Sequence, residues 1–308
     1  MTTETSSPGS NGGAVRVSVV VPTIGREAPL RRCLASLAAC RPPAAEILVV
    51  DQSHERAIAE LVTEFSAMGA RLVLCTGRGV SRGRNVGIRE SAHPVVLVTD
   101  DDCTVEPDWV ETAWRLMAVD SGQIVSGRVV PVGDERAVPS TKVDPERRDY
   151  TGEIHNGVLY GNNMALNREL VMSAGGFDER FGPSEAAEDN DFCYRWLKAG
   201  RALRYEPALV VHHHDWRTPG ELEQLYVRYA RGQGFLYAKH LRRGDLRMLA
   251  FIARDLYYVL RAFAAALVKR RERWTDPRLG IPRGLPAGLW HGWKVFWLKK
   301  RADNLVAE

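Results

Sequence analysis

The sequence predicts an α/β domain on a Rossmann-like, mixed and mainly parallel sheet with helices on both faces, followed by a basic helical extension. Apolar, β-branched runs alternate with amphipathic segments over residues 15–216, the pattern of strands joined by crossover helices. The net charge also changes sign along the chain. From Arg217 onward there are 19 Lys and Arg and 8 Asp and Glu, a net charge of +11, whereas the residues before Arg217 include 23 Lys and Arg and 30 Asp and Glu, a net charge of −7. We therefore divide the 308 residues into a tail (1–14), a domain (15–216) and an extension (217–308).

Strands and helices are expected to alternate along the domain. Strands are predicted at 15–21, 46–51, 71–75, 94–100 and 124–130, with helices at 30–39 and 57–68 and a third beginning at 81. After a charged stretch at 131–157, interpreted as a long loop, a helix is predicted at 185–199 and strands near 202–206 and 208–213. Ligands of such sheets bind at the carboxyl ends of the strands, so we expect the site there.

The tail and the cysteines indicate the compartment. Residues 1–14 are polar and rich in Gly and Ser, without the apolar run or basic start of a signal peptide, so a disordered tail is expected. The five cysteines are scattered and show no metal-type spacing, as is typical of reduced cysteines. The sequence therefore favours a cytoplasmic protein, and the basic extension would let it reach the inner face of the cell membrane.

The extension is predicted to form amphipathic helices. Over 246–268, arginines recur every seven residues and form one cationic stripe on an otherwise apolar segment: Arg247, Arg254 and Arg261. No charge-free run approaches the roughly 18–20 residues of a membrane span. The segment 290–301 mixes Trp with Lys and Arg. These helices are expected either to pack on the domain or to lie on an anionic membrane; their Leu, Phe and Trp at helical spacing argue against nucleic acid.

Three adjacent carboxylates, Asp100, Asp101 and Asp102, directly follow the predicted strand 94–100. Adjacent carboxylates raise one another's pKa unless a cation neutralises them. In extended backbone Asp100 and Asp102 point the same way, and hard oxygen ligands suit Mn²⁺ or Mg²⁺. The cluster predicts a metal site, with an acidic surface turn as the alternative.

Seven segments in order resemble the family 2 glycosyltransferases, over residues 15 to about 216. They are SVVVPTIGR (18–26), ILVVDQS (47–53), GRNVGI (83–88), LVTDDDCTVEPDW (97–109), GNNMALNREL (161–170), AGGFDERFG (174–182) and EDNDFCYRWLKAG (188–200). The resemblance implies a GT-A fold and transfer of a sugar, with inversion, from a nucleotide-diphospho-sugar, most often a UDP-sugar. It also implies Mn²⁺ or Mg²⁺ as cofactor.

The resemblance also implies which residues bind the donor. On this basis Pro22, Thr23 and Arg26 would lie near the nucleotide, Asp51 would accept a hydrogen bond from the base, Arg84 and Asn85 would contact the nucleoside or its phosphates, and Asp100 and Asp101 would complete the donor site. Asp102 is the expected direct metal ligand with Asp100 beside it, while Asp101 is expected to point away. Two alternatives stay open: a role for Asp51 as the cap of a turn only, and a solvated surface charge at Arg84.

The segment Glu188-Asp189 matches the family's acidic pair, which implies that Asp189 is the general base. A positioned carboxylate takes the proton of an alcohol as the new C–O bond forms. The alternative is that these acids only favour a helix N-terminus. The resemblance further implies acceptor contacts at Asn162 and Asn163, and a metal site completed by His212 and His214, which share one face of a strand.

The chain departs from processive members of this family. Their Gln-x-x-Arg-Trp motif is absent, because Gln224 is followed by Val227 with Arg228 one place late. We therefore expect transfer of one sugar per encounter to a hydroxyl of a glycan, a lipid-linked acceptor or a small molecule. A sugar-phosphate nucleotidyltransferase would require a Gly-rich loop after the first strand. This sequence has no such loop there. The remaining alternative is a catalytically inactive sugar-nucleotide-binding or membrane-associated interaction protein.

Overall fold

The fold is seen in a computed structural model that describes residues 15–133, 138–152, 159–182, 185–214, 218–269 and 280–298. Its strands are β1 (Val15–Thr23), β2 (Ala44–Asp51), β3 (Ala70–Leu74), β4 (Val95–Thr99), β5 (Cys103–Val105), β6 (Ile124–Val132), β7 (Arg148–Tyr150), β8 (Asn163–Asn167) and β9 (Leu203–His214). Its helices are α1 (Glu27–Ala38), α2 (Arg56–Glu64), η1 (Ser66–Met68), α3 (Val80–Glu90), α4 (Trp109–Val119), α5 (Arg168–Ser173), α6 (Glu188–Lys198), α7 (Pro219–Arg242), α8 (Arg247–Lys269) and α9 (Ile281–Trp293), with a π-helical turn at Lys294–Leu298.

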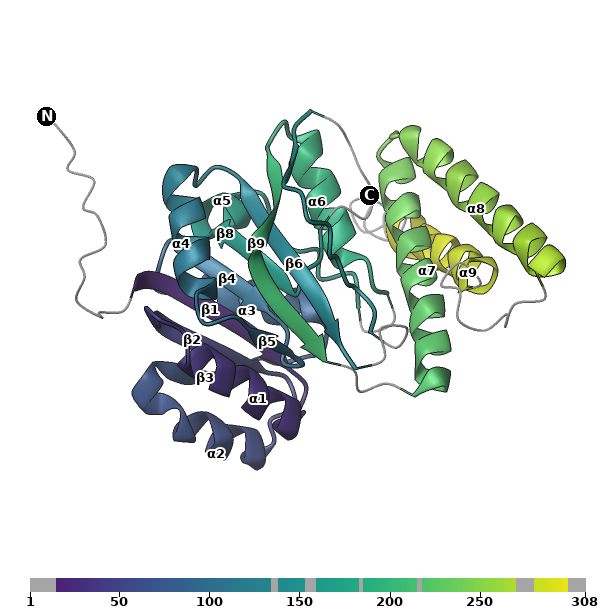
Figure 1. Cartoon of the computed structure of the whole chain (residues 1–308). Coiled ribbons are helices and arrows are strands. Elements are labelled where there is room, and N and C mark those ends of the chain that lie inside the picture. Colours follow the sequence, from purple (N-terminus) through teal and green to yellow (C-terminus); the bar gives the residue numbers. More distant parts are fainter. Residues whose placement is uncertain are drawn as a thin grey trace, which may run out of the picture.

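All nine strands join one sheet in the order β3-β2-β1-β4-β8-β6-β9-β5, and β7 pairs with β9 (Figure 1). The first four run parallel, because crossover helices return the chain to the same end of the sheet. From β8 onward the sheet is mixed: β8 is antiparallel to both β4 and β6, whereas β6 and β9 are parallel. The predicted mixed, mainly parallel α/β fold is confirmed.

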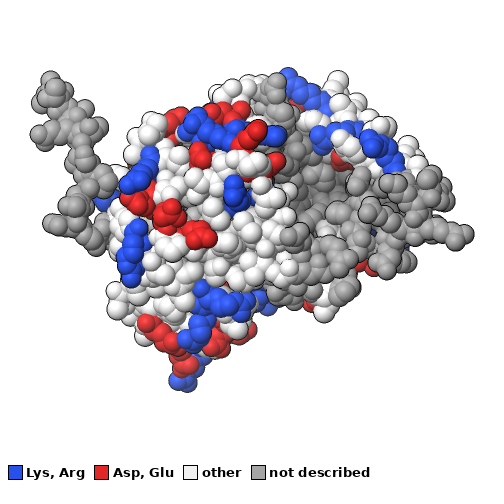
Figure 2. Space-filling model, in the orientation of Figure 1, with Lys and Arg blue, Asp and Glu red and all other residues white. Residues whose placement is uncertain are grey.

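Helices cover both faces of the sheet. Alternation along β1 sends Val19 and Val21 into one core with α1, α2 and α4, and Val20 into the other with α3, α5 and α6. Both cores are fully buried, which explains why the strands appear in the sequence as continuous apolar runs. The outer surface carries acidic and basic side chains interspersed over the α/β part (Figure 2).

The strands differ from the sequence prediction in three respects. The expected loop 131–157 contains β7, and Val129 and Lys142 form a bridge. The two strands expected near 202–206 and 208–213 are one strand, β9, whose pairing with β6 shifts register between Gly127 and Arg128. The short strands β5 and β8 were not predicted, because three to five residues show no recognisable period until neighbours pair with them.

The helical extension packs on the α/β part through α7. A third apolar cluster joins Phe181, Ala187 and Tyr194 to side chains of α7, α8 and α9, among them Phe235 and Leu285. Glycines allow the close approach of α7 and α9; a Cβ at Gly288 would overlap the carbonyl oxygen of Arg231. Among the described helices, none combines the length and the apolarity that crossing a membrane requires.

Candidate active site

The carboxyl ends of β1 and β4 bring Thr23 and the three consecutive aspartates together. Thr23 Oγ1 donates to Asp101 Oδ2 at 2.6 Å. The Arg26 guanidinium, at the start of α1, contacts both Asp101 and Asp102, with 2.8 Å between Arg26 Nη1 and Asp102 Oδ2. Burial raises the pKa of Asp101 to about 6. Asp101 therefore does not point away from the site: it is buried and holds Thr23 and Arg26 in place.

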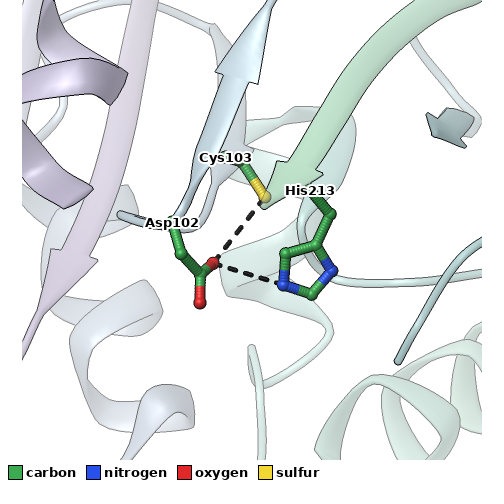
Figure 3. Close-up of side chains that lie close together, drawn as sticks. All are labelled: Asp102, Cys103 and His213. Atoms are coloured by element: carbon green, nitrogen blue, oxygen red, sulfur yellow. Dashed lines mark hydrogen bonds and ion pairs between the residues drawn. The ribbon is translucent and has the colours of Figure 1, made fainter. Parts of the chain in front are cut away.

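Asp102, Cys103 and His213 form the one group of possible metal ligands found among the described residues, with ligand atoms within 4.8 Å of one another (Figure 3). The Nε2 atom of His213 lies 3.4 Å from Asp102 Oδ1, and its Nδ1 atom lies 2.9 Å from the carbonyl oxygen of Pro139. Burial raises the pKa of the Cys103 thiol well above its ordinary value. Sulfur is also a soft ligand, which a hard cation binds poorly. A carboxylate oxygen and an imidazole nitrogen suit Mn²⁺.

The histidine next to the aspartates differs from the two predicted. His212 contacts Glu106 Oε1 at 2.7 Å and His214 contacts Thr104 Oγ1 at 2.9 Å. Both therefore lie on the face of β9 that points away from Asp102. The prediction that His212 and His214 share a face is confirmed by these contacts, but the pairing of β5 with β9 sets Cys103 opposite His213 and turns His213 inward.

Arg84 links the aspartate cluster to the acidic pair at the start of α6. Its Nη2 atom lies 3.1 Å from Asp100 Oδ1 and its Nη1 atom 2.9 Å from Glu188 Oε1. The side chain is 3% exposed, so it is not a solvated surface charge. Gly161 makes room for it, because a Cβ there would overlap the guanidinium. In the described structure Arg84 contacts two carboxylates, and its expected contact with the nucleoside or its phosphates stays a prediction.

Asp189 lies beside this bridge and is partly exposed. Its Oδ1 atom accepts the backbone N–H of Asn190 at 2.7 Å, and its Oδ2 atom accepts that of Gly161 at 3.3 Å. Burial, followed by the negative charge of Glu188, raises its pKa to about 7. The residue before the acidic pair, Ala187, has φ of +100°, a strained conformation for an L-residue that is typical of functional sites. A carboxylate poised near neutral pH can exchange a proton with a bound hydroxyl.

Two residues expected on the donor side have their polar atoms occupied by the protein. Asp51 accepts from Ser53 N, Ser53 Oγ and His54 N at 2.7–2.9 Å, so it caps the turn after β2, the alternative left open above. Asn85 donates to the carbonyl oxygen of Phe177 and accepts from its N–H, at 2.8 and 2.9 Å. Asn85 thus fixes the turn before α6. Pro22 lies at the end of β1 against the start of α3, where a Cβ at Gly83 would touch it.

The two asparagines expected on the acceptor side play different parts. Asn163 is fully buried and bonds Trp109 Nε1 and the carbonyl oxygens of Arg128 and Leu209 at 2.9–3.0 Å. It therefore holds β8 to β6 and β9 and does not face an acceptor. Asn162 is 2% exposed, and neither polar atom of its side chain has a hydrogen-bond partner in the described part of the chain. Its amide stays a predicted contact for a bound molecule.

A buried ionic cluster, which the motifs did not predict, fixes the helix that carries Asp189. Asp191 is fully buried between Lys239 Nζ, at 2.6 Å, and His240 Nε2, at 2.9 Å. Lys239 also contacts Asp178 at 2.7 Å. Burial alone would raise the pKa of Asp191, but the hydrogen bond from His240 and the charge of Lys239 hold it well below its ordinary value. The extension therefore supports the site, because Lys239 and His240 belong to α7.

A second contact between α7 and the site lies at the loop before α6. A Cβ at Gly232 would overlap the carbonyl oxygen of Ala186, so only glycine allows this approach. Glu185 in the same loop pairs with Arg231 at 2.9 Å and with His291 at 2.8 Å. The segment around Arg231 therefore packs on the loop that positions Asp189.

Replacing Lys239 by Met is expected to lower the free energy of unfolding by about 3–5 kcal/mol, because it leaves Asp191 buried with part of its charge uncompensated. Urea unfolding followed by circular dichroism measures the loss. The control is Arg56→Met, which breaks an exposed pair with Glu60 and should change stability little. The double variant Lys239→Met/Asp191→Asn should recover part of the loss. Equal stability of Lys239→Met and the unaltered protein would contradict a supporting role for the cluster.

Residues 18–173, about half of the chain, match the family model described as "Glycosyl transferase family 2". The "Pre-mycofactocin glycosyltransferase" of Mycobacterium tuberculosis is 29% identical over 220 residues, covering 65% of this chain and 44% of that protein. The "Glucosyl-dolichyl phosphate glucuronosyltransferase" of Haloferax volcanii is 25% identical over 236 residues, covering 70% and 74%. This chain thus spans less than half of the length of the first relative.

Two solved structures are similar in fold. The mannosyltransferase PcManGT of Pyrobaculum calidifontis, in complex with GDP-Man and Mn²⁺, superposes with a TM-score of 0.63 at 19% identity, covering 90% of this chain and 87% of that chain. TarS 1–349 of S. aureus, in complex with UDP-GlcNAc, gives a TM-score of 0.54 at 16% identity, covering 74% and 72%. The observed fold is therefore that of GT-A glycosyltransferases.

Proposed function

Because this chain belongs to glycosyl transferase family 2 and is a glycosyltransferase, we propose that it moves one sugar from a nucleotide-diphospho-sugar to an acceptor hydroxyl with inversion at the anomeric carbon. One observation carries the proposal: Arg84 joins Asp100, of the aspartate cluster, to Glu188, beside Asp189. The carboxylates that we propose for metal binding and for proton acceptance thus belong to one connected network, which supports a single displacement.

Asp102 and His213 would hold a divalent cation, Mn²⁺ or Mg²⁺. Their oxygen and nitrogen atoms, on the carboxyl side of the sheet, fit such an ion, and PcManGT was crystallised with Mn²⁺ and GDP-Man. When bound, the ion supplies positive charge that stabilises the departing diphosphate. Arg26 contacts the carboxylate of Asp102 in this structure. When the cation binds, Arg26 would have to release Asp102 or share its carboxylate with the cation. Asp101, held by Thr23, would keep Arg26 close by.

Asp189 would act as the general base. It takes the proton of the acceptor hydroxyl while the oxygen forms a bond to the anomeric carbon, and the bond to the diphosphate breaks with its electron pair on the leaving oxygen. Its raised pKa supports this role, because a base near neutral pH accepts the proton most effectively. Glu188 would act through Arg84, whose position it fixes. Inversion follows from a single displacement that uses one base.

We propose a UDP-sugar as the donor, with GDP- and dTDP-sugars as the alternative donors. Binding of UDP, GDP and dTDP, each with and without Mn²⁺, is measured by the shift in unfolding temperature. One nucleotide is expected to stabilise the protein only with the metal, by about 2.7 kcal/mol at a concentration 100-fold above its Kd.

Chelation by EDTA is the control and should return the unfolding temperature to that of the free protein. If none of the three nucleotides stabilises the chain, the proposal fails. The same result would exclude a catalytically inactive sugar-nucleotide-binding protein. Of the alternative, only a membrane-associated interaction protein would then remain.

A further inference from the structure

Helix α8 (Arg247–Lys269) carries two adjacent apolar faces, although only one of them packs on the protein. Met248 is fully buried, Val259 nearly so, and Phe251 and Ile252 pack against the third apolar cluster. These residues lie three or four apart, as expected for the core-facing side of a helix. The inner face therefore accounts for the attachment of α8 but leaves its other apolar residues unexplained.

The outer face carries a continuous aliphatic stripe that remains in solvent. Leu246, just before the helix, is 69% exposed, Leu249 54%, Leu256 50% and Leu260 68%, and Ala253 completes the row. The spacing of three and four residues places all of them on one side of the helix, next to the face that carries Met248 and Val259. Four exposed leucines in one row exceed what a soluble surface normally shows, so the stripe marks a binding surface.

Arginines border this stripe, and exposed tryptophans occur elsewhere in the extension. Arg247 and Arg261 are exposed. On the helix surface they lie next to the row of leucines, along one edge of the stripe. Figure 2 shows basic side chains beside uncharged surface in the region of α8. Near the end of the described chain, Trp290, Trp293 and Trp297 are also 39–56% exposed, and Lys294 lies over the ring of Trp290 at 4.9 Å. Trp next to Lys and Arg is typical of side chains at a membrane–water interface.

We propose that the outer face of α8 is a docking surface for an anionic lipid bilayer, in which the leucines enter the headgroup–acyl boundary and the arginines meet lipid phosphates. Charge selects this occupant: residues from 217 onward carry +11, which favours anionic lipid and disfavours a second copy that would bring the same positive charge into contact. The inference does not depend on which sugar the enzyme transfers.

Co-sedimentation with vesicles tests the proposal, using the full chain. The protein is expected to pellet with phosphatidylcholine vesicles that contain phosphatidylglycerol, and to pellet less with phosphatidylcholine alone or at high salt. The triple variant Leu249→Glu/Leu256→Glu/Leu260→Glu should lower the partition coefficient at least about tenfold, because it removes the apolar anchor. The pair Arg247→Glu/Arg261→Glu should lower it by about tenfold or more, on anionic vesicles alone.

The matched control is Val119→Glu, which places a charge at an 83% exposed position at the end of α4, far from α8 in the sequence. It should leave vesicle binding unchanged. Unfolding temperature and Mn²⁺-dependent nucleotide binding, measured on every variant, keep this test separate from that of the proposed function. Equal pelleting of the triple variant would overturn the proposal. So would a dimer in solution, seen by analytical ultracentrifugation, that the same three substitutions dissociate.

Discussion

Substituting Asn for Asp189 is expected to lower kcat by about 10²–10⁴-fold while donor binding stays within about twofold. Asn has the shape of Asp and can still accept a backbone N–H, but it cannot take a proton from the acceptor hydroxyl. The loss should fall on kcat alone, because Asp189 contributes to the step in which the proton moves and not to the binding of the nucleotide. Steady-state kinetics with the identified donor, together with nucleotide calorimetry, separate the two effects.

The pH dependence of the unaltered enzyme provides a second view of the same residue. Because the pKa of Asp189 is raised to about 7, the carboxyl is protonated and inactive below that pH, so kcat should rise with pH and level off above it. The contribution of Asp189 to folding stability changes with pH in the opposite direction. A carboxyl whose pKa is higher in the folded than in the unfolded state loses its stabilising contribution as pH rises toward 7. Asp189→Asn should therefore be at least as stable as the unaltered protein above pH 7.

The control for Asp189→Asn is Asp120→Asn, a change of the same chemistry at an exposed residue after α4. It should leave kcat and its pH profile unchanged. Retained turnover in Asp189→Asn, with the rising limb of the pH profile intact, would exclude Asp189 as the base. Glu188, which contacts Arg84, would then be the next carboxylate to test.

Substituting Asn for Asp102 is expected to weaken Mn²⁺-dependent nucleotide binding by more than about 100-fold, since loss of a direct ligand should exceed the roughly 10–100-fold cost of an outer partner. Calorimetric titration with Mn²⁺ and the nucleotide, each alone and together, measures the coupling between them.

Two histidine variants make this second test specific. His213→Ala removes the imidazole beside Asp102 and should also weaken Mn²⁺-dependent binding. His212→Ala is the matched control, since that side chain contacts Glu106 on the other face of β9. Unaltered Mn²⁺ binding in both Asp102→Asn and His213→Ala would reject this metal site. Loss in His212→Ala alone would mean that the cation binds on the outer face.

Several site residues could be placed from the sequence because the backbone pattern near them is local. The run 94–100 predicted a buried strand, and the structure has the aspartates directly after β4. The predicted helix at 185–199 begins at Glu188, and the stripe of Phe192, Cys193, Trp196 and Leu197 is buried as its spacing requires. Strand and helix periods depend on neighbouring residues, so a single sequence carries them.

The partners of the polar side chains could not be read in the same way. Arg84 and Glu188 are 104 residues apart in the chain, and Lys239 and Asp191 are 48 apart. Asn85 and Asn163 carry donors and acceptors that suit a ligand equally well, and only the neighbouring turn and strands show that the protein itself uses them. A motif indicates that a polar residue is needed, whereas its partner depends on which elements meet in space.

What the sequence by itself determined is the alternation of strands and helices up to β4, the acidic segments at 100–102 and 188–189, and the basic extension, because these follow from period and composition along the chain. Only the tertiary structure decided that His213 faces Asp102, that Arg84 bridges two carboxylates, and that α7 holds the helix of Asp189. The physical reason is the same in each case. A strand's alternation makes His212 and His214 share a face, but the side of the sheet on which that face lies depends on pairing with β5.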